Sequence, residues 1–111
     1  MNGNECISET LGDYVLVRLS GEVDLSWSQQ VRRAILDALG DTGKVGVELS
    51  QVSYIDSSGI AALVEGFQNA RSHNRKFGLV GVSGAVMAVL QLARLDRVFP
   101  IFADLDAARS A

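Results

Sequence analysis

The stretch Tyr54-Ile55-Asp56-Ser57-Ser58-Gly59-Ile60 is the junction around which the chain is organised. The segment 44–55 leads into it, and its first half alternates apolar with other residues, as a β-strand does. A helical pattern follows, with apolar residues about 3.6 positions apart at Ile60, Leu63, Val64 and Phe67. A strand that passes directly into a helix predicts an α/β unit with one carboxylate and two hydroxyls at the connection.

Strand-like and helical segments alternate along the rest of the chain in the order β-β-α-β-α-β-α-β-α. Segments 6–10 and 14–20 flank a Gly-Asp turn and predict an opening hairpin, whose second strand should be half-buried with Arg18 facing outward. Alternation of strands with helices favours parallel pairing through right-handed crossovers. We therefore expect a single α/β domain over residues 1–111, with a mixed, mostly parallel sheet of four to five strands, an N-terminal antiparallel hairpin and about four helices.

Several residues predict where these elements begin and end. Gly21-Glu22-Val23-Asp24 should end the second strand, Ser26 should cap the first helix and Gly40 should stop it. The last strand is expected over 98–102, with Pro100 marking an edge or an end. Caps of the last two helices are expected at Ser83 and Asp104.

Composition excludes several classes of function. The net charge of -3 argues against a nucleic-acid-binding protein, which normally carries a basic patch. The single cysteine, Cys6, excludes an internal disulfide framework and a cysteine-rich metal site. Neither a signal peptide nor an apolar run long enough to span a membrane is visible, so we expect a cytoplasmic protein.

Catalysis is not predicted, because no nucleophile, base and acid converge. A serine hydrolase needs a base beside its serine, and the only histidine, His73, would lie roughly 24 Å from Ser57 along one helix. Glycines 78, 81 and 84 have the wrong spacing for a dinucleotide-binding loop, and no cluster has metal-ligand spacing. We expect a binding module that needs no cofactor and no metal.

Two interpretations of the serine junction remain open from the residues alone. Aspartate and serine before a helix are what capping selects, because a side-chain oxygen accepts a hydrogen bond from an unpaired amide. The other interpretation is a phosphorylation switch at Ser57, since a phosphate adds about -1.5 to -2 of charge at an exposed helix start. Gly59 fits both, and in the second it would leave the surface beside the serines flat and open.

Three segments together resemble a STAS domain, most closely the bacterial anti-sigma factor antagonists. They are Gly21-Glu22-Val23-Asp24, Val52-Ser53-Tyr54-Ile55-Asp56-Ser57-Ser58-Gly59-Ile60 and Val98-Phe99-Pro100-Ile101. The resemblance covers nearly the whole chain in the right order of elements. The pairing of Gly-Glu-x-Asp with Asp-Ser-Ser-Gly some thirty residues later is more specific than either motif alone.

The resemblance implies a function and its residues. Family members bind an anti-sigma factor that is also a serine kinase, which consumes the ATP and phosphorylates the serine directly after the motif aspartate, here Ser57. Phosphorylation blocks binding, and a phosphatase reverses it. The earlier motif aspartate, here Asp24, lies close to the phosphorylated serine, and Ser58 is left mainly as a cap. The implied partner-binding residues are therefore Asp24, Asp56, Ser57, Ser58 and Gly59.

STAS domains also serve as accessory subunits of lipid transporters, where they bind an ATPase subunit. The resemblance therefore implies an alternative: an accessory subunit of an ABC-type lipid transporter, in which Ser57 is a structural residue without a phosphorylation switch.

Overall fold

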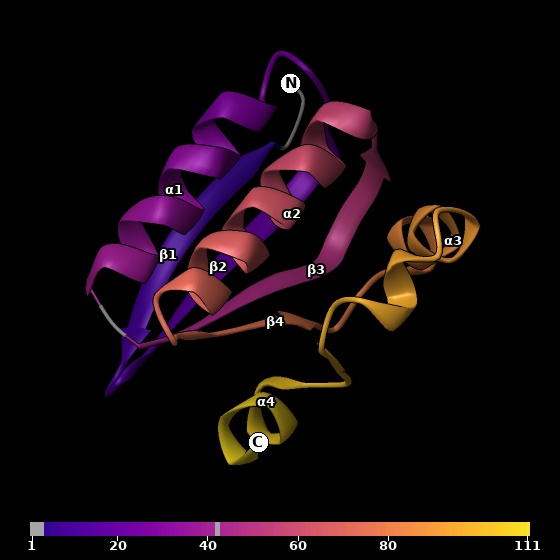
Figure 1. The fold of residues 1–111 in the computed structure, drawn as a ribbon. Coiled ribbons are helices and arrows are strands. Elements are labelled where there is room, and N and C mark those ends of the chain that lie inside the picture. The colour runs from indigo at the N-terminus through magenta and orange to yellow at the C-terminus, as the bar shows by residue number, and fades with distance from the viewer. Residues whose placement is uncertain (1–3, 42) are drawn as a thin grey trace.

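The computed structural model describes residues 4–41 and 43–111. These form a five-stranded sheet in the order β1-β2-β3-β4-β5 (Figure 1). The strands are β1 (Glu5–Leu11), β2 (Tyr14–Val23), β3 (Lys44–Ile55), β4 (Lys76–Val80) and β5 (Ile101–Phe102). The helices are α1 (Ser28–Asp41), α2 (Ser57–Ser72), α3 (Gly84–Leu92) and α4 (Leu105–Ser110), with a 3-10 turn at Leu95–Arg97. β1 pairs antiparallel with β2 and the other neighbours pair parallel, which confirms the expected α/β fold with its opening hairpin.

Helices α1 and α2 lie side by side over one face of the sheet (Figure 1). Val17, Val47 and Leu79 are paired in register across β2, β3 and β4, and all three are fully buried. Ile35 of α1 and Leu63 of α2 are buried in the same core. Because β2 and β3 run parallel, their carboxyl ends meet at one edge of the sheet, and there the chain passes into α1 and α2.

The short helix α4 packs on the opposite face of the sheet. Its Ala108 forms a second apolar cluster with Tyr14, Leu16 and Val80. The expectation that β2 is half-buried is therefore wrong for its first residues, which are covered on both faces. It holds at Arg18, which is exposed and pairs with Glu9 and Glu48. The sequence did not predict this because the cover comes from a helix almost a hundred residues further along the chain.

Strand β2 does not end at Gly21 as predicted, but continues to Val23. Gly21 has a φ of +87°, and the pairing with β3 shifts register on either side of it. The amide of Glu22 donates a hydrogen bond to Asn4 Oδ1 at 2.8 Å. Glycine here forms an irregularity inside a strand instead of a break, since only the local twist changes and the pairing resumes.

Two other predicted boundaries are wrong. Helix α1 continues through Gly40 to Asp41, because a glycine in the last turn weakens a helix without preventing its hydrogen bonds. The predicted last strand over 98–102 is reduced to Ile101–Phe102, because the amides of Val98 and Phe99 donate to the carbonyl of Leu95 and close a turn.

The predicted caps of the last two helices are confirmed. Ser83 Oγ accepts from the amide of Val86 at 3.3 Å, and Asp104 Oδ1 accepts from the amide of Ala107 at 2.9 Å. Ser26 is not a cap, because its hydroxyl donates to Asp24 and α1 begins at Ser28.

Candidate functional site

Asp56 is the N-cap of α2. Its Oδ1 accepts hydrogen bonds from the amides of Ser58 at 2.9 Å and Gly59 at 3.1 Å, two donors that a helix start leaves unpaired. Ser58 Oγ donates to the same oxygen at 2.6 Å. The expectation that Ser58 is the cap is therefore wrong: the carboxylate caps the helix and Ser58 holds the carboxylate.

These hydrogen bonds keep the Asp56 carboxyl group ionised. The hydroxyl of Ser58 is the main group that lowers its pKa, and the amides of Gly59, Ser58 and Leu25 act in the same direction, while desolvation opposes them. A negative charge is therefore held at the start of α2 throughout the neutral range.

Asp24 forms a turn of the same kind at the end of β2. Its Oδ1 accepts from the amide of Ser26 at 3.0 Å and from Ser26 Oγ at 2.6 Å. Its carbonyl oxygen accepts from the amides of Trp27 and Ser28, which leads the chain into α1. The two motif aspartates thus stand in equivalent Asp-x-Ser turns, each joining a strand to the helix that follows.

The two turns lie next to each other. The amide of Asp56 donates to the carbonyl of Val23 at 3.2 Å, and the amide of Leu25 contributes to the low pKa of Asp56. The structure therefore brings the loop of Asp24 to the start of α2, as the parallel pairing of β2 and β3 requires.

Gly59 faces inward, and the expectation that it keeps an open, flat surface is wrong. It is buried, and a Cβ atom at this position would lie 2.7 Å from Ile55 Cγ1 and 2.9 Å from the carbonyl oxygen of Val23. Such contacts are too close for any side chain. Gly59 therefore lets the first turn of α2 pack directly against the ends of β2 and β3.

The middle residue of each Asp-x-Ser turn points to solvent. Ser57 is exposed, and its hydroxyl forms no hydrogen bond with the described residues. Leu25 is 73% exposed, and Tyr54, just before the second turn, is 50% exposed. The two neighbouring turns thus carry a free hydroxyl at Ser57 and exposed apolar side chains at Leu25 and Tyr54, which the helical and strand patterns did not identify. The available signal was that both lie outside the apolar stripes.

A shallow groove of about 200 Å³ runs from these turns between α1 and α2. Leu25 and Ser58 line it at one end and Ala61 further along. Arg32 Nε of α1 and Glu65 Oε1 of α2 lie 2.7 Å apart across it, which lowers the pKa of Glu65 and raises that of Arg32.

Other sequence expectations concern residues outside this site. His73 lies at the C-terminal end of α2, the opposite end from Ser57, so the two do not form a catalytic pair. Among residues 4–41 and 43–111, no three His, Cys, Asp or Glu side chains gather as metal ligands would. In the same part of the chain, no helix combines the length and the apolar character needed to cross a membrane.

The fold and the site define a small α/β module that presents a free hydroxyl at the junction of a central strand and a helix. The chain belongs to the STAS domain family, whose model matches residues 6–108. The resemblance on which the sequence prediction rested is therefore confirmed.

Relatives with known names match this chain over nearly their whole length. The anti-sigma-B factor antagonist of Listeria monocytogenes is 26% identical over 102 residues, which cover 91% of this chain and 90% of the relative. An anti-sigma factor antagonist from Mycobacterium paratuberculosis has a crystal structure with a TM-score of 0.86 and 25% identity, covering 96% of this chain and 91% of that one. The Bacillus cell fate determinant SpoIIAA in its phosphorylated form matches with a TM-score of 0.75 and 22% identity, over 96% and 97% of the two chains.

Proposed function

We propose that this chain is an anti-sigma factor antagonist: it binds an anti-sigma factor that is also a serine kinase, and phosphorylation of Ser57 ends that binding. A phosphatase restores it, and the ATP is bound by the partner. The observation that carries the proposal is the contrast between two neighbouring hydroxyls. Ser57 is exposed without a hydrogen bond to the described residues, whereas Ser58 donates to Asp56 at 2.6 Å.

The contrast favours Ser57 as the phosphorylated residue. Phosphoryl transfer needs a hydroxyl that the active site of a kinase reaches and aligns. Transfer to Ser58 would break its bond to the carboxylate and disturb the cap of α2, while transfer to Ser57 leaves both in place. A switch at Ser57 therefore changes the surface and preserves the fold.

The partner-binding surface in this proposal consists of the two Asp-x-Ser turns and the groove between α1 and α2. Leu25 and Tyr54 offer exposed apolar area, which supplies most of the affinity at the centre of many interfaces. Asp24 and Asp56 shape the turns, and Gly59 supports them from below.

Charge explains how the phosphate would act. A phosphate at Ser57 would add about -1.5 to -2 of charge beside the ionised Asp56, and the dipole of α2 would partly offset the repulsion. The folded state therefore tolerates the modification. A partner whose contacts match an uncharged serine on this partly apolar surface would be repelled, since desolvating an unpaired dianion is costly.

Affinity capture from the source cells tests the proposed partner. Ser57→Ala and Ser57→Asp proteins serve as baits, and Ser72→Asp adds the same charge at the other end of α2 as a matched control. We expect a small kinase-like ATPase on the Ser57→Ala and Ser72→Asp baits and its loss from the Ser57→Asp bait. Recovery of the ATPase and membrane subunits of a transporter by all three baits would refute the proposal and favour the transporter alternative.

Phosphorylation by the captured kinase tests the assignment of the residue. With ATP, the wild-type and Ser58→Ala proteins should each gain one phosphate, and the Ser57→Ala protein should gain none. Phosphate found on Ser58 of the wild type, or anywhere on the Ser57→Ala protein, would show that the exposed hydroxyl is not the substrate.

A further inference from the structure

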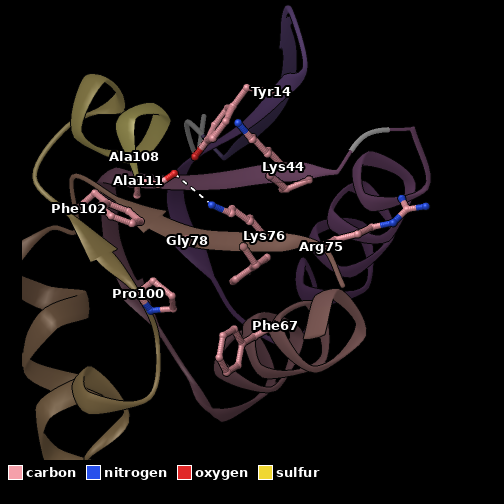
Figure 2. Close-up of a pocket in the computed structure, with 12 residues that line it drawn as sticks. Tyr14, Lys44, Phe67, Arg75, Lys76, Gly78, Pro100, Phe102, Ala108 and Ala111 are labelled. Carbon is pink, nitrogen blue, oxygen red and sulfur yellow. Dashed lines mark hydrogen bonds between the residues drawn. The ribbon is translucent and has the colours of Figure 1, made fainter. Parts of the chain in front are cut away.

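A second candidate site lies at the other end of the sheet, where β3 and β4 begin. It is a half-open cavity of about 270 Å³, here called the β4 cavity (Figure 2). The residues that line it are Tyr14, Lys44, Val45, Phe67, Arg75, Lys76, Phe77, Gly78, Pro100, Phe102, Ala108 and Ala111. Because Ser57 follows the end of β3, this cavity is separate from the proposed switch.

Two glycines and a short strand create the cavity. Gly46 and Gly78 are paired in register on β3 and β4, and a Cβ at Gly46 would overlap the hydroxyl of Tyr14. A Cβ at Gly78 would lie 2.7 Å from the ring of Phe102. Because these positions have no side chains, the ring of Tyr14 packs against β3 at Gly46 and the ring of Phe102 packs against β4 at Gly78. β5 pairs with Leu79 and Val80 alone, so the first half of the β4 edge stays uncovered.

The lining is apolar with a basic mouth. Four aromatic rings and Pro100 form much of the wall, and none of the described residues that line it is Asp or Glu. Lys44 and Lys76 are directly opposite each other on β3 and β4, a pairing of like charges that disfavours the sheet. Each ammonium has a partner at the rim: Lys44 Nζ lies 3.4 Å from Asp13 Oδ2, and Lys76 Nζ donates to the backbone oxygen of Ala111, the last described residue, at 3.2 Å. An anionic group of a ligand at this rim would meet ammonium groups from both strands.

Tyr14 adds a polar group inside the cavity. The residue is 4% exposed, and its hydroxyl forms no hydrogen bond with any described residue. Figure 2 shows the hydroxyl oxygen directed toward the other residues that line the cavity. A hydroxyl that reaches the cavity without a protein partner is free to donate a hydrogen bond to a ligand.

We propose that the β4 cavity binds an aliphatic monocarboxylate such as octanoate, with its carboxylate held by Tyr14, Lys44 and Lys76. The hydrocarbon chain lies against the aromatic wall. An apolar pocket with a few convergent polar groups at one end is the general form of a site for such amphipathic ligands. The proposal does not depend on the role of Ser57.

Titration of the ¹⁵N-labelled protein with octanoate, followed by amide chemical shifts, tests the site. We expect saturable shifts at Lys76, Gly78, Phe102 and Ala108, with Ser57 unaffected. Octan-1-ol lacks the carboxylate and acetate lacks the chain, and both should bind at least about tenfold more weakly, as expected from the loss of charged hydrogen bonds or of apolar burial. Octanol that binds as tightly as octanoate, or shifts without saturation, would overturn the proposal.

Three variants locate the ligand. Tyr14→Phe removes only the hydroxyl, and Lys76→Gln changes an exposed side chain, so both should fold and weaken octanoate binding about tenfold. Arg109→Gln removes a cation from the exposed side of α4, outside the cavity, and should bind octanoate like the wild type. Equal affinity in all three variants would show that octanoate does not occupy the β4 cavity.

Discussion

Replacing Gly59 by alanine tests the packing that places Ser57 at the surface. A Cβ at this position would lie 2.7 Å from Ile55 Cγ1, 2.8 Å from Val23 Cγ1 and 2.9 Å from the carbonyl oxygen of Val23. Val23 is fully buried and Ile55 is 4% exposed, so neither side chain has room to move away. Alanine therefore forces the first turn of α2 away from β2 and β3.

Two terms of opposite sign set the magnitude. Overpacking a well-filled core costs about 1–3 kcal/mol. Alanine gains up to about 1 kcal/mol over glycine in a helix, and less in the first turn. The net expectation is a loss of about 1–2 kcal/mol in the free energy of unfolding, or a fall of about 4 °C in Tm for each kcal/mol.

Gly40→Ala is the matched control, because it makes the same change in α1. A Cβ at Gly40 meets no atom of the described residues within 4 Å. This variant should therefore be stabilised by a few tenths to about 1 kcal/mol. Urea denaturation followed by circular dichroism measures both variants. If Gly59→Ala matched or exceeded the wild type in stability while Gly40→Ala behaved as expected, the close contact inferred at Gly59 would be refuted.

Three further predictions concern the stability of the fold. The carboxyl group of Asp56 has a lowered pKa in the folded state. Its contribution to the free energy of unfolding is therefore present above its ordinary pKa and is lost as pH falls through the lower folded value. The free energy of unfolding of Asp56→Asn should depend less on acid pH than that of the wild type. Phe99 is 4% exposed and contacts two other aromatic rings, so Phe99→Ala should cost about 3–5 kcal/mol by urea denaturation, and a loss below 1 kcal/mol would contradict its place in the core. Ser83 accepts from Val86 and donates to the carbonyl of Val52 at 2.7 Å, so Ser83→Ala should lower the unfolding free energy by about 1 kcal/mol, whereas an unchanged denaturation midpoint would show that the cap contributes nothing.

The order of elements was predictable from the sequence because hydrophobic periodicity is local. The alternation in 44–50 and the helical period after Ser57 identified β3 and α2, and the caps at Ser83 and Asp104 were correctly placed. The irregularity at Gly21 was not predictable, because a glycine inside a strand and a glycine that ends a strand look alike in the local sequence.

The sequence by itself determined that the chain is an α/β fold with an aspartate and two serines at its central junction, since these follow from patterns within a few residues. Only the tertiary structure decided which hydroxyl is free. Ser57 and Ser58 are chemically identical neighbours, and the helical turn aims one at Asp56 and the other at solvent. The tertiary structure alone also brought Leu25 and Ser58 to one groove and joined Tyr14, Lys76 and Phe102 around one cavity. Those contacts join residues far apart in the chain. They are set by sheet pairing and helix packing, which local periodicity does not predict.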